Sequence, residues 1–362
     1  MRAKINMKKN IAVLAGDGIG PEVVDQALKV VKAIEKKFGH EFTYTPALVG
    51  AVAIDKTGDP YPPETHEICM KSDAVLFGAI GHPRFDNDPK ATVRPEQGLL
   101  RMRKTLGLYA NIRPISTFKS LMHKSPLKTE LVDGADFIVI RELTGGIYFG
   151  ARGRSEDRNT AFDTCTYTKD EVIRITKLAF EYARKRKKKV CAVDKANVLE
   201  TSRLWRETIQ ELHKDYSDIE LEFMFVDNAA MQLVTWPKKF DVMVTENMFG
   251  DILTDEASVI TGSLGMLPSA SVGIHTSVFE PIHGSYPQAA GKNIANPIGT
   301  ILSAALMFEY SLGLPEAGKL IRDAVDASIA KGIVTIDIAG EGSKSCSTTE
   351  VGDWVAEYVA KS

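Results

Sequence analysis

The segment Asn247–Glu256 carries two aspartates at a spacing that suits metal chemistry. Asp251 and Asp255 are four residues apart, so on a helix both carboxylates lie on the same face. No histidine or cysteine stands beside them, and paired oxygen ligands favour a hard cation such as Mg²⁺ or Mn²⁺. The alternative is that acids in a first helical turn only stabilise the helix dipole. The spacing alone leaves both interpretations open.

Three arginines stand next to apolar runs of the sequence, namely Arg103, Arg113 and Arg141. A guanidinium group binds a carboxylate through two parallel hydrogen bonds and keeps its charge when partly buried. Together the three could hold a dicarboxylate, although each one taken singly could equally be a surface residue.

Three titratable side chains are candidates for proton transfer or ligand binding. Tyr148 follows two glycines, Lys195 follows a buried-looking strand, and Asp227 stands at the end of another strand. Desolvation or neighbouring charges could bring such groups into a useful pKa range. A lone lysine or tyrosine is more often structural, so these residues become informative only in combination.

A glycine-rich segment, Gly16–Pro21, follows a predicted strand and opens a predicted helix, as a dinucleotide-binding loop does. Its third glycine, however, comes one residue earlier than the G-x-G-x-x-G pattern requires. The expected acidic residue at the end of a second strand is also missing, since that region reads Phe38–Glu41. We therefore do not interpret this segment as a Rossmann cofactor site.

The elements that would position these residues alternate between short β-branched runs and amphipathic helices. Predicted strands are Ile11–Ala15, Ala74–Ile80, Phe137–Ile140, Val190–Val193, Leu221–Val226 and Val242–Thr245. One helical stripe runs from Val23 to Ile34 after Pro21, and a capping box at Thr168 opens a helix that should bury Val172, Ile175, Leu178 and Tyr182. This alternation predicts α/β layers around a largely buried sheet.

The bulk properties limit the class of protein. The 362 residues suit two domains, and a formal charge of -2 gives no electrostatic reason to expect nucleic acid or an anionic membrane as partner. The basic run Arg184–Lys189 is better interpreted as the end of a helix. Four scattered cysteines suit a reducing cytosol, and no apolar stretch is long enough for a membrane span. We expect a soluble cytoplasmic protein without a signal peptide.

Eight segments of the sequence, in a fixed order, contain most of the candidate residues described above. Over its whole length the chain resembles the isocitrate/isopropylmalate family of β-decarboxylating dehydrogenases. The matching blocks are Gly16–Glu22, Glu96–Arg103, Leu108–Pro114, Arg141–Gly150, Val193–Glu200, Asn247–Glu256, Gly262–Ala270 and Glu280–Pro297.

The resemblance implies a two-domain α/β fold that is not a Rossmann fold, with cofactor and substrate in the cleft between the domains. The first domain would be built from both chain ends, residues 1–109 and 262–362. The second domain, residues 110–261, would carry the interface of a homodimer whose active sites are shared between the subunits.

The same resemblance implies a role for each candidate. Asp251 and Asp255 would bind Mg²⁺ or Mn²⁺ together with Asp227 of the partner, and the three arginines would grip the substrate carboxylates. Lys195 of the partner would be the general base, and Tyr148 would be the acid that protonates the enol. The cation would stabilise negative charge on the substrate oxygens as a Lewis acid.

The implied reaction is the oxidative decarboxylation of 3-isopropylmalate to 4-methyl-2-oxopentanoate in leucine biosynthesis. Leu99, Leu100 and Val198 of the partner would offer an apolar surface to the isopropyl group, next to Glu96. Isocitrate enzymes place a serine and an asparagine where this chain has Gln97 and Leu99, so a third carboxylate would be unpaired here and isocitrate is disfavoured. D-malate or tartrate is the alternative substrate. A catalytically silent binding protein would be expected to have lost part of this residue set, which is complete here.

The implied cofactor is NAD, which would lie against the loop His283–Asn296, with Glu280 as a further contact. The residues in question are Glu280, His283, Gly284, Ser285, Tyr286, Gln288, Ala289 and Asn296. Many NAD-using relatives carry an aspartate at the position of Gln288, and NADP-using relatives carry a lysine and a tyrosine at Gln288 and Ala289. We therefore expect NAD, with weaker discrimination against NADP than usual.

Overall fold

The computed structural model describes residues 6–86, 91–340 and 342–362. The chain divides into two compact units. Unit 1 comprises the residues up to Leu108 and those from Gly262 to Ser362, and unit 2 comprises Tyr109–Thr261. The sequence placed the first break one residue later, after residue 109, and residues 1–5 of the expected first domain lie outside the described residues.

The described residues of unit 1 include five strands that form a largely parallel array. They are β1 (Lys8–Gly16), β2 (Glu41–Pro46), β3 (Ala74–Ala79), β11 (Pro268–Gly273) and β12 (Val278–Pro281). Their order is β2-β1-β3-β12-β11, and all neighbours are parallel except β11 and β12. Strands from both ends of the chain are therefore interleaved in one array.

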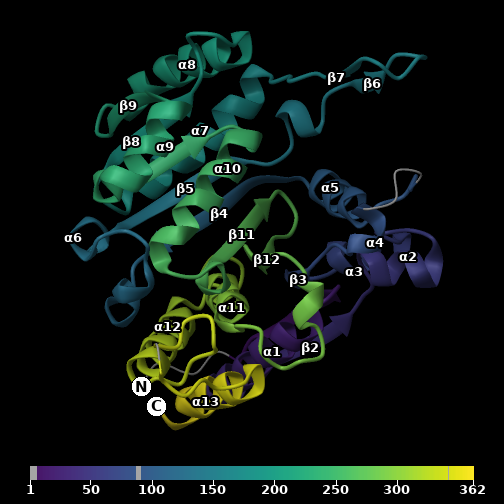
Figure 1. Ribbon diagram of the computed structural model, residues 1–362, viewed down its shortest axis with the longest axis vertical. Coiled ribbons are helices and arrows are strands. Elements are labelled where there is room, and N and C mark those ends of the chain that lie inside the picture. Colours follow the sequence, from purple (N-terminus) through teal and green to yellow (C-terminus); the bar gives the residue numbers. More distant parts are fainter. Residues whose placement is uncertain (1–5, 87–90, 341) are drawn as a thin grey trace. The chain divides into compact units, whose positions relative to one another are not determined.

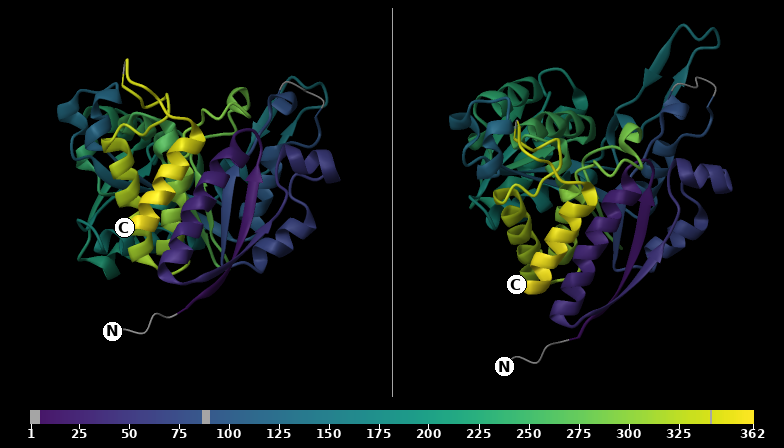
Figure 2. Two further views of the ribbon diagram at one scale, coloured as in Figure 1. Left: turned by 90° about the horizontal axis from the view of Figure 1, so that it is seen from below. Right: turned by 60° about the horizontal axis from the view of Figure 1, so that its bottom comes forward.

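The long helices of unit 1 come from both ends of the chain. They are α1 (Gly20–Phe38), α11 (Ile298–Tyr310), α12 (Pro315–Ala330) and α13 (Thr348–Lys361). Figure 2 shows α1 and α13 side by side, with α12 next to α13. The buried face of α1 includes the predicted stripe from Val23 to Ile34 except Leu28, which is half-buried, because residues three and four apart share one side of a helix.

The shorter helices of unit 1 lie between β2 and Leu108 in the sequence. They are α2 (Ala51–Thr57), α3 (Pro63–Met70), α4 (Pro83–Asp86) and α5 (Pro95–Thr105). Buried side chains of α3 and α5, among them Cys69 and Met102, share a hydrophobic cluster with Leu14 and Phe77 of β1 and β3. Leu99 of α5 packs against the edge of this cluster.

Unit 2 contains a second group of five strands. They are β4 (Leu108–Ser116), β5 (Asp136–Glu142), β8 (Lys189–Asp194), β9 (Glu220–Phe225) and β10 (Val242–Thr245). Their order is β4-β5-β10-β8-β9, with β4 antiparallel to β5 and the other neighbours parallel. Four consecutive parallel strands place their carboxyl ends at one edge, where ligands of α/β proteins usually bind.

The helices of unit 2 follow these strands and pack on the sheet. They are α6 (Thr129–Val132), α7 (Lys169–Arg184), α8 (Glu200–His213), α9 (Val226–Thr235) and α10 (Asn247–Ser258). A hairpin of β6 (Arg152–Arg154) and β7 (Ala161–Asp163) extends away from the rest of this unit (Figure 1). No helix of the described residues is long and apolar enough to cross a bilayer.

The α/β prediction is confirmed, and the predicted helix start at Thr168 is present. Thr168 accepts a hydrogen bond from the backbone N–H of Glu171, whose carboxylate accepts the N–H of Thr168 in return. The predicted buried face of α7 was partly wrong, since Leu178 and Tyr182 are only half-buried. The helix instead buries Thr176, Ala179, Phe180 and Ala183, because its face is rotated toward the sheet.

The Gly16–Pro21 turn packs against the chain itself. Gly16 and Gly18 have positive φ angles of 72° and 59°, and a Cβ at Gly18 would overlap the carbonyl of Ser285. The backbone N–H of Ile19 donates to that carbonyl at 2.8 Å. These glycines are therefore needed for a tight turn and a close approach between two chain segments.

Candidate functional site

The two aspartates of the acidic segment lie on α10, which starts immediately after β10. The N-cap residue Glu246 accepts a hydrogen bond from the backbone N–H of Phe249 at 2.8 Å and so fixes the start of the helix. Asp251 and Asp255 follow one turn apart, as the spacing predicted. Both carboxylates are in part accessible to solvent, so oxygen ligands are available to a cation.

Arg113 and Arg141 reach these carboxylates from neighbouring strands. Arg141 on β5 forms an ion pair with Asp251. Arg113 on β4 approaches Asp251 at 3.7 Å and Asp255 at 3.6 Å. The antiparallel register pairs Asn111 with Arg141, which places the two arginines close together. Arg113 is further held by its Nε–H, which donates to Asn111 at 2.6 Å.

Burial and the neighbouring charges of this cluster shift the pKa of Asp255. Burial raises the pKa of Asp255, the positive charge of Arg113 opposes that rise, and the negative charge of Asp251 adds to it. Two aspartates and two arginines together carry no net charge. A divalent cation and a doubly charged dicarboxylate would also balance each other, so the cluster can receive both without a large excess of charge.

Tyr148 joins the same cluster from a short 3₁₀ turn, Gly146–Tyr148. Its hydroxyl donates to Asp251 at 3.0 Å, and the Arg141 guanidinium lies 5.9 Å from the centre of its ring. Burial raises the pKa of Tyr148, and the charge of Asp251 raises it further, against the opposing charge of Arg141. The phenol therefore stays protonated at neutral pH and can act as a proton donor.

Lys195 and Asp227 form a separate pair in the same unit. Lys195 follows the end of β8, Asp227 lies in the first turn of α9, and the two charged groups are 3.0 Å apart. The hydrogen bond from Lys195 lowers the pKa of Asp227. Within the described residues no three acidic, histidine or cysteine side chains gather as a metal site, so Asp227 does not join Asp251 and Asp255 of its own chain.

Arg103 lies in unit 1, on α5, and is nearly buried. Its guanidinium is 3.6 Å from the carboxylate of Glu280 on β12. The Nε–H of Arg103 is buried and has no hydrogen-bond partner among the described residues. A buried donor without a partner is costly, and a ligand carboxylate would satisfy it.

The residues predicted to contact the isopropyl group are partly accessible. Leu99 and Leu100 on α5 are half-buried, and Glu96 at the start of that helix is exposed. Val198 in unit 2 is 61% exposed on the turn between β8 and α8. An exposed valine on a turn is available to a ligand or to another subunit.

The predicted cofactor segment borders a pocket of about 380 Å³ in unit 1. Four predicted residues line it, namely His283, Gly284, Tyr286 and Asn296. The predicted contact Ala289 does not line it, because its side chain is 0% exposed and packs with Ile19 and Val23 in a small hydrophobic cluster. Glu280, Ser285 and Gln288 also do not line this pocket.

The sequence reasoning missed several residues of this pocket. They are Ile19, Ser263, Leu264, Gly265, Ile294, Ala295, Ile336 and Asp337. The carboxylate of Asp337 accepts hydrogen bonds from Asn296 at 2.9 Å and from Ser263 at 2.6 Å. Ile19 belongs to the Gly16–Pro21 turn, so that turn contributes an apolar wall to the pocket.

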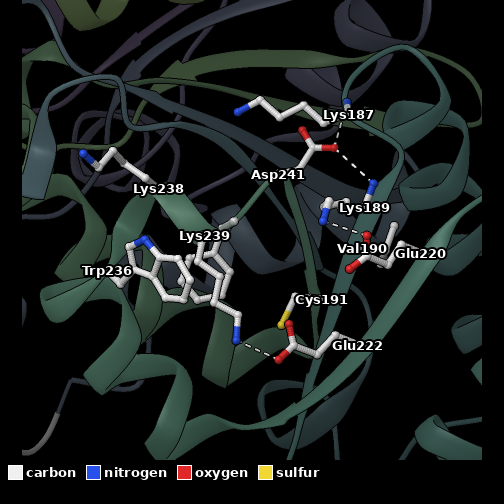
Figure 3. Close-up of a pocket in the computed structure, with 11 residues that line it drawn as sticks. Lys187, Lys189, Val190, Cys191, Glu220, Glu222, Trp236, Lys238, Lys239 and Asp241 are labelled. Atoms are coloured by element: carbon white, nitrogen blue, oxygen red, sulfur yellow. Dashed lines mark hydrogen bonds and ion pairs between the residues drawn. The ribbon is translucent and has the colours of Figure 1, made fainter.

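A second pocket of about 380 Å³, in unit 2, contains none of the predicted site residues (Figure 3). Its lysines are largely paired, with Lys189 on Glu220 and Lys239 on Glu222, each at 2.7 Å. Arg186 is similarly paired with Asp241. The basic run at the end of α7 therefore neutralises nearby acids, as expected for a structural role.

Comparisons with known proteins cover nearly the whole chain. The sequence model described as isocitrate/isopropylmalate dehydrogenase matches residues 10–355. A Bacteroides fragilis (strain YCH46) protein named 3-isopropylmalate dehydrogenase is 59% identical over 355 residues, which are 98% of this chain and 100% of that protein. An Aquifex aeolicus protein of the same name is 55% identical over 359 residues, 98% of each chain.

Solved structures show the same relationship. An isocitrate dehydrogenase from Methylococcus capsulatus superposes with a TM-score of 0.88 and 34% identity, covering 97% of this chain and 99% of the other. A β-decarboxylating dehydrogenase from Thermococcus kodakarensis gives a TM-score of 0.78 and 35% identity, covering 98% of this chain and 96% of the other.

Proposed function

Because the chain belongs to the isocitrate/isopropylmalate dehydrogenase family, we propose that it oxidises and decarboxylates 3-isopropylmalate to 4-methyl-2-oxopentanoate in leucine biosynthesis. The observation that carries the proposal is the cluster of Asp251, Asp255, Arg113, Arg141 and Tyr148 around one helix start. It combines oxygen ligands, carboxylate-binding cations and a proton donor, which this reaction needs together.

The donor set fits a divalent cation and a dicarboxylate. Asp251 and Asp255 offer hard oxygen ligands, which suit Mg²⁺ or Mn²⁺. When bound, the cation supplies Lewis-acid stabilisation of negative charge on substrate oxygens. Arg113 and Arg141 would bind substrate carboxylates, and Arg103, whose Nε–H lacks a partner, would add a third cation.

Proton transfer falls to two side chains. Lys195 would accept the proton of the substrate hydroxyl, and Tyr148 would return a proton to the enol carbon after loss of CO₂. The raised pKa of Tyr148 supports the donor role, since the group stays protonated at neutral pH. His283, Tyr286 and Asn296, which line the 380 Å³ pocket, would hold part of NAD, and the cofactor would supply the hydride acceptor when bound.

Two features support a homodimer with shared sites. First, the Lys195–Asp227 pair stands apart from Asp251 and Asp255, as it would if each pair served a different site. Second, apolar side chains are exposed on α9, on α10 with the residue that follows it, and on the β6–β7 hairpin. These side chains are Met231, Val234, Ile252, Val259 and Phe162. A second copy of the chain is the proposed cover for this surface, in agreement with the apolar character of permanent interfaces.

The proposed substrate is tested by steady-state kinetics on purified protein with Mn²⁺ or Mg²⁺. Formation of NADH would be compared for 3-isopropylmalate, D-malate and isocitrate, with a chelator as control. We expect kcat/KM to favour 3-isopropylmalate by about a hundredfold. Contact with the half-buried Leu99 and Leu100 would stabilise a bound isopropyl group, whereas a carboxylate there would lose its hydration without gaining a partner. A preference for D-malate would reject the proposed substrate and keep the metal and proton-transfer assignments.

The proposed cofactor is tested in the same assay with NADP. The neutral Gln288 would not repel a 2′-phosphate, and no lysine stands at that position to bind one through its charge. We expect a preference for NAD that is smaller than in relatives with an aspartate there. Equal kcat/KM for the two cofactors would contradict the assignment.

A further inference from the structure

Asn247, the first residue of α10, links two parts of the proposed site. It is 1% exposed, and its side-chain oxygen accepts hydrogen bonds from Nε and Nη2 of Arg141 at 3.2 and 2.8 Å. Its side-chain nitrogen donates to the carbonyl of Gly145 at 3.2 Å. A guanidinium group only donates and a carbonyl only accepts, so these partners fix the orientation of the amide.

The turn that Asn247 reaches is the one that carries Tyr148. A Cβ at Gly145 would lie 2.6 Å from the ring of Tyr167, and one at Gly146 would lie 2.5 Å from its hydroxyl. Gly146 also has a φ of +76°. The turn is therefore pressed against Tyr167 and has little freedom to move.

Tyr167 in turn holds Asn247. Its hydroxyl accepts the backbone N–H of Asn247 at 2.9 Å and donates to the carboxylate of Glu246 at 3.1 Å. The ring packs edge-on against Trp205, with centres 5.4 Å apart. The backbone of Asn247 is thus fixed by a buried aromatic side chain, and its side chain is fixed by Arg141.

We propose that Asn247 is a positioning residue that sets Arg141 and the Tyr148 turn relative to the aspartates of α10. Both Arg141 and Tyr148 contact Asp251, so an error in either position would also displace this carboxylate. The proposal rests on the proposed function, in which Arg141 binds a substrate carboxylate and Tyr148 supplies a proton. An apolar side chain could make none of these hydrogen bonds. A side chain that only accepts could bind Arg141 but not the carbonyl of Gly145.

The test is the Asn247→Ala variant of the full chain, assayed with Mn²⁺, NAD and 3-isopropylmalate. We expect the KM for 3-isopropylmalate to rise about tenfold and kcat to fall about tenfold, since hydrogen bonds to a charged group are lost. The KM for NAD should stay within about twofold, because the cofactor pocket is built from other residues of the chain. Calorimetric titration with 3-isopropylmalate and Mn²⁺, without NAD, should show the same loss of binding.

Asn247→Ser is the second variant, because its single hydroxyl oxygen can take the place of the amide oxygen or of the amide nitrogen but not of both atoms. It should give a smaller loss in the same parameters. The matched control is Asp241→Asn, which weakens a buried anchor at the other end of β10. Asp241 accepts a hydrogen bond from Arg186 and one from the backbone N–H of Lys187 (Figure 3). This control should lower the thermal midpoint and leave the KM for 3-isopropylmalate within about twofold.

The outcomes separate this inference from the proposed function. Inactive wild-type protein on 3-isopropylmalate would reject the function. An active wild type whose folded Asn247 variants keep both kcat and KM for 3-isopropylmalate would overturn the positioning role. A parallel rise of both KM values, matched by the Asp241→Asn control, would show a general loss of structure instead.

Discussion

Asp251 contacts more members of the proposed site than its neighbour Asp255 does. Its carboxylate meets the guanidinium of Arg141 and the hydroxyl of Tyr148, and Arg113 lies 3.7 Å away. Removal of one member would leave the others with unbalanced charge in a half-buried place, which is costly. Single substitutions in this cluster are therefore expected to affect binding and proton transfer together.

Lys195 offers a cleaner test, because its ion-pair partner is Asp227, outside that cluster. We expect Lys195→Ala to reduce kcat by about 10²-fold or more, the usual contribution of a general base. Binding of Mn²⁺ and of 3-isopropylmalate should remain measurable by calorimetry. A kcat close to that of the wild type would remove Lys195 from the base role.

The raised pKa of Asp255 gives a prediction on pH. Its folded-state pKa lies above the usual value of an aspartate, so the protonated form persists to a higher pH than in the unfolded chain. That protonated form contributes stability at low pH, and the contribution is lost as pH rises through the folded pKa. A metal needs the carboxylate, so Mn²⁺ affinity should fall on acidification, starting above the ordinary aspartate range.

Calorimetric titrations with Mn²⁺ from about pH 7 down to about pH 4, the ordinary aspartate range, would measure this dependence. In the Asp255→Asn variant the affinity should be low at every pH in this window. A Mn²⁺ dissociation constant for the wild type that does not change across the window would contradict the prediction.

Among the elements, helix α10 packs closely against β5 and β10. Gly250 lies between its N-cap and Asp251, and a Cβ there would come within 2.6 Å of Cγ of Arg141 and 2.9 Å of Cγ2 of Thr245. The close approach of α10 to β5 and β10 therefore depends on a glycine. It places the aspartates beside the arginines that precede them by more than a hundred residues in the sequence.

Gly250→Ala tests this packing. In an unobstructed helix the change would stabilise the protein by up to about 1 kcal/mol. Here we expect a loss of about 1–3 kcal/mol in the free energy of unfolding, since the added methyl group displaces buried neighbours. Denaturant unfolding would measure it, with Lys177→Ala on the exposed face of α7 as control. Equal or greater stability in Gly250→Ala would show that the helix can shift.

At the scale of the whole molecule, the proposed dimer makes each site depend on two chains. Helices α9 and α10 carry exposed apolar side chains. Met231 on α9 and Ile252 on α10 are each 60% exposed. A surface of this kind on a monomer is uncommon and is expected to bind a partner. Sedimentation of the purified protein should give the mass of two chains.

Sharing of the site is tested by mixing two inactive variants, Lys195→Ala and Tyr148→Phe, after dissociation and reassembly. If each site takes Lys195 from one chain and Tyr148 from the other, half of the dimers are mixed and each has one intact site. We therefore expect recovery of about a quarter of the wild-type activity. If both residues act within one chain, no intact site forms and activity stays absent.

The fold was predictable where the chemistry is local. Buried parallel strands such as β8 and β10 read as continuous apolar runs, and the capping box of α7 has a fixed spacing. The strands β2, β4, β11 and β12 were not predicted, because their residues of mixed polarity carry little periodic signal. Their strand conformation depends on neighbours far away in the sequence.

For the site, the sequence by itself determined the residue types and their spacing: two aspartates one helical turn apart, arginines on strands, and a tyrosine after two glycines. Only the tertiary structure decided which of them meet. It brings Arg113 and Arg141 to Asp251, pairs Lys195 with Asp227, buries Ala289, and places Asn247 and Asp337 among the relevant contacts. The physical reason is that these contacts join residues distant in sequence, so their geometry follows from packing, which no local pattern records.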